Sequence, residues 1–172
     1  MAHLAAVWGL VGVLGILGFA VYRLTPMALG AFDFRFGAAE WVVFVVWMVF
    51  MIYSEGVRGF HQAFSPRVVA RARVLPRRLR PVNVVLAPFF CFGFFHATKK
   101  RMIVSWSVAA GIVCLVLLVR LLPQPWRGIV DCGVVSGILV GMVSILYYTG
   151  RWITGRPFEY PPDLPPAKET KP

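Results

Sequence analysis

Four long apolar runs constrain this chain more than any other feature of its sequence. They cover residues 4–22, 37–53, 102–122 and 129–149. A helix of about 20 apolar residues matches the hydrocarbon core of a bilayer, which is about 30 Å thick. Only 15% of the residues are charged, against about 25% in an average soluble domain. We therefore predict an all-α integral membrane protein with four transmembrane helices, built as one membrane domain over residues 1–150.

The segment between the second and third runs is strongly basic. Residues 58–101 hold ten of the eighteen Lys and Arg residues, and we predict that residues 54–101 form a cytoplasmic module. Ser65 and Pro66 are typical of a helix start. Beyond them the apolar residues fall on one side, which predicts a basic amphipathic helix lying on the membrane surface. Those apolar residues are Val68, Val69, Ala72 and Leu75.

The basic residues of this module are candidates for contact with anionic phospholipids or an acidic partner. Each cation near an anionic leaflet contributes about 1 kcal/mol of attraction. The alternative is that these charges only set the topology. The net charge of +11 does not indicate nucleic acid, because the cations border apolar runs. The candidate contact residues are Arg67, Arg71, Arg73, Arg77, Arg78, Arg80, Lys99, Lys100 and Arg101.

Residues 82–97 form a fifth apolar segment, which is short for a membrane span. As a helix it would be about 24 Å long at 1.5 Å per residue, and it contains Pro88 and Gly93. If it crossed, its two basic flanks would lie on opposite sides of the membrane, against the usual charge bias. We therefore favour a re-entrant or interfacial segment over a crossing helix.

The distribution of charge predicts the orientation. With four spans, fourteen Lys and Arg residues fall on the side of the basic module and the C-terminal tail, and four on the other side. Because cytoplasmic loops are enriched in Lys and Arg, both termini are expected in the cytoplasm, in a bacterial inner membrane. Residues 151–172 are rich in proline, which predicts a flexible tail.

Two features of the spans predict helix packing. Gly133, Gly137 and Gly141 recur every four residues and share one helix face, which lets another helix approach closely. That neighbour is either the first span or another subunit, so a homo-oligomer or a membrane-protein complex is expected. Arg120 and Asp131 flank the turn between the last two spans, and we predict that they form a structural ion pair.

Few residues suggest chemistry. Glu55, Arg58 and His61 form a polar cluster at the expected membrane edge, but the sequence has no hydrolase, zinc-peptidase or phosphate-loop motif. The three cysteines share no metal-ligand spacing, so neither metal nor cofactor is predicted. The expected function is a non-enzymatic scaffold, accessory or lipid-contacting subunit. The alternatives are a small transporter or channel that uses residues 82–97, and a redox accessory that binds haem or quinone through His61 or His96.

Overall fold

The computed structural model describes residues 2–78, 84–156 and 160–164. Within these ranges the secondary structure is helical, with no strand. Four helices are long and apolar enough to cross a membrane: Leu4–Asp33, Ala38–Val74, Lys99–Val119 and Trp126–Ile153. The all-α prediction and the expectation of four helices of spanning length are thereby confirmed.

The helices follow one another with few long connections. The first long helix is α1 (Ala2–Leu29), followed by the short 3₁₀-helix η1 (Gly30–Asp33). The second begins as α2 (Ala38–Met51), continues as the π-helix η2 (Ile52–Phe64) and ends as α3 (Ser65–Val74) and the 3₁₀-turn η3 (Leu75–Arg78). The remaining helices are the short α5 (Ala87–Phe92) and the long α6 (Lys99–Val119) and α7 (Trp126–Ile153).

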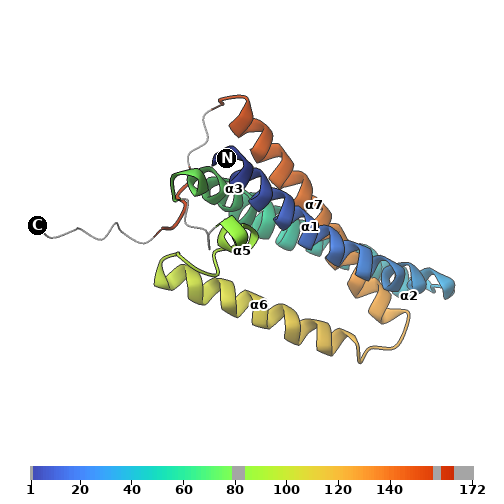
Figure 1. The fold of residues 1–172 in the computed structure, drawn as a ribbon. Helices are drawn as coiled ribbons and strands as arrows, with labels where there is room; N and C mark the ends of the chain where they lie inside the picture. The colour runs from blue at the N-terminus through green and yellow to red at the C-terminus, as the bar shows by residue number, and fades with distance from the viewer. Residues whose placement is uncertain (1, 79–83, 157–159, 165–172) are drawn as a thin grey trace, which may run out of the picture.

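The long helices run between two ends of the molecule (Figure 1). One end holds the N-terminus, α3, α5 and the last turns of α7, and we call it the basic end. The other end holds η1, the start of α2 and the connection between α6 and α7. Successive long helices therefore run in opposite directions, as four successive crossings of a membrane would require.

The second long helix extends much further than residues 37–53. It is continuous over Ala38–Val74, 37 residues, or roughly 55 Å at 1.5 Å per residue. The predicted surface helix after Ser65 is therefore wrong, because α3 is the end of this helix and is buried between α1, α5 and α7. An apolar stripe packs equally well on lipid or on protein, and here it packs on protein.

The other helix bounds also differ from the predicted spans. α1 continues through Pro26 to Leu29, and the hydroxyl of Thr25 donates to the carbonyl of Val21 (2.7 Å). α6 begins three residues before the predicted start at residue 102, and α7 runs from Trp126 to Ile153.

The core lies at the basic end, where α1, α3, α5 and α7 meet. Gly9 and Gly12 of α1 let α5 approach, because a Cβ at Gly9 would lie 3.0 Å from the Cys91 sulfur and one at Gly12 would clash with Pro88. α5 itself ends at Gly93, whose φ of +85° favours glycine. The central buried side chains are Leu10, Val13, Val69, Leu75, Phe90 and Ile145.

The described part of the 82–97 segment does not cross the molecule. Residues 84–97 contain the six-residue α5 and a following turn, all at the basic end, while Val82 and Asn83 lie outside the described residues. A six-residue helix is about 9 Å long, so it cannot span a bilayer. Its entry into the membrane stays a prediction.

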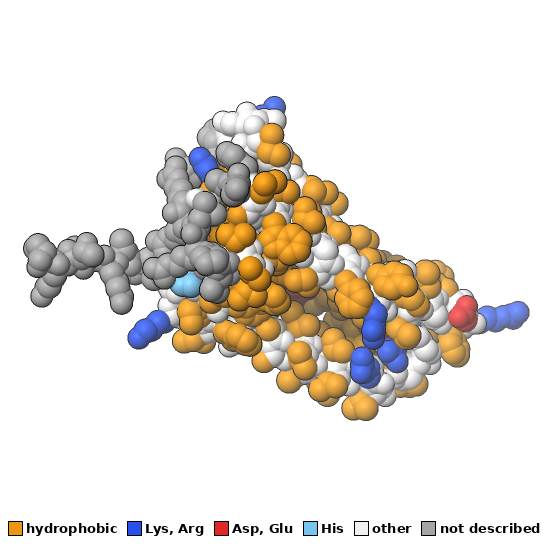
Figure 2. Space-filling view, in the orientation of Figure 1, with side chains coloured by type: hydrophobic (Ala, Val, Ile, Leu, Met, Phe, Trp, Pro, Cys, Tyr) orange, Lys and Arg blue, Asp and Glu red, His pale blue; other side chains and the backbone are white. Residues whose placement is uncertain are grey.

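α6 stands apart from the other helices (Figure 1). In the described part of the chain it has no extensive interface with another helix, and most of its apolar side chains are exposed. Figure 2 shows hydrophobic side chains covering the long helices, with basic groups mainly toward the two ends. Most of the surface of α6 therefore faces the surroundings of the molecule and not another helix.

Candidate functional site: an arginine cluster at the basic end

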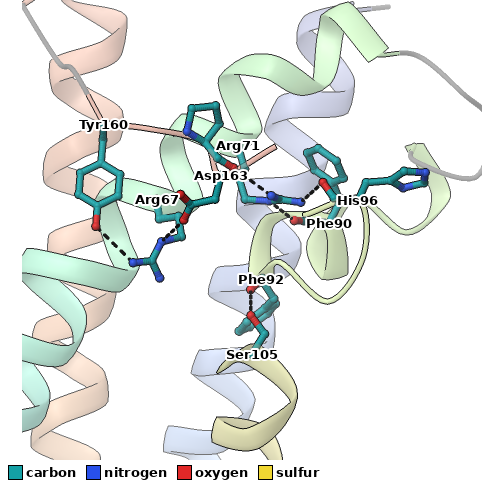
Figure 3. Close-up of polar contacts among 9 residues, drawn as sticks. Arg67, Arg71, Phe90, Phe92, His96, Ser105, Tyr160 and Asp163 are labelled. Carbon is teal, nitrogen blue, oxygen red and sulfur yellow. Dashed lines mark hydrogen bonds and ion pairs between the residues drawn. The ribbon is translucent and has the colours of Figure 1, made fainter. Parts of the chain in front are cut away.

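Arg71 lies at the centre of the basic end and is fully buried. Its Nε donates to the carbonyl of Phe90 (2.6 Å), and one terminal nitrogen donates to the carbonyls of Phe95 (2.9 Å) and His96 (3.3 Å). The other terminal nitrogen donates to the carbonyl of Pro162 (3.0 Å). The guanidinium also lies 4.3 Å from the ring centre of Phe90. Arg71 therefore joins α3 to α5, the following turn and the C-terminal segment (Figure 3).

Arg67, one turn before Arg71, binds the same C-terminal segment. A terminal nitrogen donates to the hydroxyl of Tyr160 (3.2 Å), and its Nε lies 3.3 Å from a carboxylate oxygen of Asp163. The backbone carbonyl of Asp163 also accepts from the amide of Thr98, just before α6. Residues 160–164, which we call the C-terminal strap, thus connect α3 with the start of α6.

The predicted flexibility of residues 151–172 stays a prediction, but the C-terminal strap contacts the rest of the protein. Its backbone and side chains bind α3 and Thr98 through Tyr160, Pro162 and Asp163. A proline-rich segment has little entropy to lose when it is ordered, so a few charge-assisted hydrogen bonds are enough to hold it. Residues 157–159 and 165–172 lie outside the described residues.

Arg101 completes the cluster from the first turn of α6. Its guanidinium lies close enough to Arg67, Asp163 and Tyr160 to interact with them electrostatically. Beside it, Ser105 donates to the carbonyl of Phe92 (3.2 Å), and the ring of Trp106 lies 5.1 Å from that of Phe94. These contacts are the main attachment of α6 to the basic end.

We call Arg67, Arg71 and Arg101 the arginine cluster. Asp163 lies within electrostatic range of all three guanidinium groups. One carboxylate against three guanidinium groups leaves an excess of two positive charges. Positive charge that is partly shielded from water and left uncompensated favours an anion.

The predicted contact residues thus divide into separate groups. Arg67 and Arg71 bind protein atoms. Because Arg71 has no exposed surface, the structure gives no support to its predicted contact with lipid or an acidic partner. Arg73, Lys99 and Lys100 are exposed and remain available to headgroups. The side chains of Arg77 and Arg78, and all of Arg80, lie outside the described residues.

Cys91 lies against this site and is shielded from water. Its sulfur faces Gly9 of α1, and burial raises the pKa of the Cys91 thiol to about 12, although the positive charge of Arg71 opposes the shift. The thiol is therefore protonated at neutral pH. It acts as a small apolar side chain and not as a nucleophile.

The glycine face of α7 is occupied within the chain. A Cβ at Gly133 would lie 2.5 Å from Nε1 of Trp47 on α2, and one at Gly137 would lie 3.1 Å from the Cβ of Glu55 on η2. At Gly141 it would clash with the ring of Phe60. The neighbour of this face is thus the second long helix, so the face gives no support to association with another subunit.

The predicted ion pair between Arg120 and Asp131 is replaced by another. Asp131 lies 3.8 Å from Arg127, one turn earlier on its own helix, while Arg120 is exposed. α6 and α7 diverge from their connection (Figure 1). Matching positions on the two helices therefore do not bring these side chains together.

The polar cluster predicted at the membrane edge lies on η2. Nδ1 of His61 is 3.0 Å from the hydroxyl of Ser144 on α7, and its ring packs beside Tyr148. Glu55 and Arg58 are exposed on the same helix. His96 is also exposed and belongs to the turn after α5. In the described ranges no three His, Cys, Asp or Glu side chains are grouped as metal ligands would be.

Comparison with protein-family models, curated proteins and solved structures gives no significant match.

Proposed function

We propose that this chain is a non-enzymatic membrane protein whose basic end binds anionic phospholipid headgroups, in a scaffold or accessory role. The observation that carries the proposal is the arginine cluster, with its excess of positive charge over Asp163. Three further exposed cations, Arg73, Lys99 and Lys100, belong to the same end. Clustered cations beside membrane-spanning helices attract anionic lipid.

The surface of α6 supports the lipid assignment. Its first turns line an open hollow of about 420 Å³, with Met102, Ile103, Trp106 and Ser107 beside Lys99. Apolar side chains below a cation match the two parts of a phospholipid, an acyl chain and a charged headgroup. Trp106 has the amphipathic ring that favours the membrane interface.

The charge bias supports an orientation. The basic end holds the N-terminus, α3, α5 and the end of α7. The basic module and the C-terminal tail, which the sequence assigns to this side, contain fourteen of the eighteen Lys and Arg residues. By the positive-inside bias, we place this end in the cytoplasmic leaflet of a bacterial inner membrane, where anionic lipids are exposed to it.

Binding of two lipids that differ in headgroup tests the proposal. The purified protein in a neutral detergent is titrated with phosphatidylglycerol or phosphatidylcholine of the same chains, and bound lipid is counted by native mass spectrometry. We expect tighter binding of phosphatidylglycerol. Replacing Arg73, Lys99 and Lys100 together by Gln should weaken it roughly tenfold, because three cations near the headgroup are lost.

The opposite end of the molecule supplies a matched control. Arg23, Arg35 and Arg120 are exposed there, and their replacement by Gln removes the same charge. We expect this variant to bind phosphatidylglycerol like the wild type. Equal binding of the two lipids by the wild-type protein would contradict the proposed function.

A further inference from the structure

We propose that Arg67 and Arg101 form a binding site for the phosphodiester group of one anionic phospholipid, and that the carboxylate of Asp163 occupies this site when no lipid is bound. The inference rests on the proposed function and goes further, because it assigns the site and a means of regulating it. The C-terminal strap is then a built-in competitor of the headgroup.

The first argument is an excess of hydrogen-bond donors. A guanidinium has five N–H groups in a fixed fork, and the cluster contains three guanidiniums. The Nε atoms of Arg67 and Arg101 are both buried, and within the described residues neither has an acceptor in hydrogen-bond geometry. The Nε of Arg67 has only the looser ion pair with Asp163 at 3.3 Å. Buried donors without acceptors are rare in proteins.

The second argument is that Arg71 cannot provide the site. Its nitrogens are bound to four backbone carbonyls, and it has no exposed surface. Arg71 instead fixes α3, which carries Arg67, and the turn after α5, which leads to Arg101. The guanidiniums of Arg67 and Arg101 lie within electrostatic range of each other. Two guanidiniums converging on one anion are the usual arrangement for recognising phosphate.

The third argument is that Asp163 resembles a bound anion. Its carboxylate faces Arg67 and lies within electrostatic range of Arg101. About a third of its side chain is exposed, so a headgroup can reach the site from the surface without opening the core. A phosphodiester presents two charged oxygens in place of the two carboxylate oxygens, and it can serve the donors that Asp163 leaves unpaired.

The strap contact also explains how the site can exchange its occupant. Asp163 is held by one ion pair, and its backbone carbonyl by the amide of Thr98. The backbone contact does not depend on the carboxylate. The side chain of Asp163 can therefore leave Arg67 while the strap keeps its other contacts, through Tyr160 and Pro162.

Four single substitutions test the site in the same lipid titration. Asp163→Asn removes the competing charge and nearly preserves shape, so phosphatidylglycerol should bind at least threefold tighter. Arg101→Gln should weaken binding at least fivefold. Lys100→Gln removes the same charge from the neighbouring exposed position and should weaken binding only about twofold, its share of the tenfold effect of the triple replacement. Arg101→Lys keeps the charge but not the planar fork, and it should also bind weakly. Helix content, measured by circular dichroism, checks that each variant is folded.

Two results would overturn the inference while leaving the proposed function intact. One is unchanged or weaker binding by Asp163→Asn, which would give Asp163 a purely structural role. The other is an equal loss in Arg101→Gln and Lys100→Gln, which would mean diffuse attraction without a site. If the wild type did not prefer phosphatidylglycerol at all, the proposed function itself would fail.

Inorganic phosphate separates a lipid headgroup from a free anion. We expect millimolar inorganic phosphate to leave bound phosphatidylglycerol in place, because the lipid also has its chains along the helices. Complete displacement at that concentration would assign the site to a soluble anion and would overturn the headgroup assignment.

Discussion

Arg71 connects parts of the chain that are far apart in sequence. Its four carbonyl partners come from α5, the turn after α5 and the C-terminal strap. A buried guanidinium is tolerated when its donors are satisfied and an aromatic face lies against it, and Phe90 provides that face. Arg71 therefore helps to fix the position of the strap, together with Arg67 and Thr98, and the position of the turn before α6.

Replacing Arg71 by Lys should destabilise the protein by about 2–3 kcal/mol. An ammonium group has three donors and no planar fork, so several buried carbonyls would lose their partner, at about 1–3 kcal/mol each. The midpoint of unfolding, measured by circular dichroism in detergent, should fall accordingly. Arg73→Lys makes the same change at an exposed position on the same helix and should shift it by less than 0.5 kcal/mol. Equal stabilities of the two variants would contradict this role of Arg71.

The burial of Arg71 could have been predicted from spacing. Residues 68, 71, 72 and 75 follow the i, i+3, i+4, i+7 pattern of one helix face, so Arg71 lies inside the apolar stripe. Sequence reasoning assigned it to lipid because a basic residue is usually exposed. Tyr160 and Asp163 gave no comparable signal, since a proline-rich tail carries no periodicity that shows where it binds.

At the level of elements, the glycines of α7 determine how closely the second long helix approaches. Their spacing of four identifies the face, and the closest contacts are with Trp47, Glu55 and Phe60. The sequence predicted this face but not its neighbour, because a small-residue stripe accepts any helix of suitable shape. The helix ends were predicted least well, since continuous helix through residues 54–74 depends on burial of α3 by α1, α5 and α7.

Gly133→Ala should destabilise the protein, whereas Gly150→Ala should not. The new Cβ at Gly133 would lie 2.5 Å from Nε1 of Trp47 and 2.8 Å from Cγ of Met51, while at Gly150 it would meet no atom within 4 Å. We expect a loss of about 1–3 kcal/mol from overpacking at Gly133. At Gly150 the higher helix propensity of Ala should be neutral or stabilising by up to about 1 kcal/mol. Denaturant titration in detergent measures both; a Gly133→Ala protein as stable as Gly150→Ala would refute the close approach of α2.

On the scale of the whole molecule, three long helices pack together and α6 does not. It is attached mainly through Ser105 and Trp106 at the basic end and through its connection to α7 at the other. The number of spans was predictable from hydropathy, because length and apolar composition suffice for it. The separation of α6 was not predictable, because an apolar run does not indicate whether lipid or protein covers it.

We expect α6 to move relative to the other helices. Few buried contacts hold it, and such elements open at low free-energy cost. In a Cys132→Ser background, spin labels on the native Cys114 of α6 and on a cysteine replacing Val143 of α7 report this distance. For the α2–α7 control, Cys114 is replaced as well, and the labels are attached to cysteines that replace Val46 of α2 and Val143 of α7. Pulsed electron paramagnetic resonance should give a broader distance distribution for the α6 pair; equally narrow distributions would show that α6 is fixed.

The most direct test of the account is to find where an anionic lipid touches the protein in a membrane. Phosphatidylglycerol with a photoreactive group next to its headgroup is incorporated into vesicles with the protein, and the cross-linked peptides are identified by mass spectrometry. We predict cross-links within residues 65–78 and 96–107, and far fewer with a phosphatidylcholine probe of the same design. Cross-links concentrated at residues 23–40 and 120–127, or the same pattern with both lipids, would contradict the proposal that the basic end binds anionic headgroups.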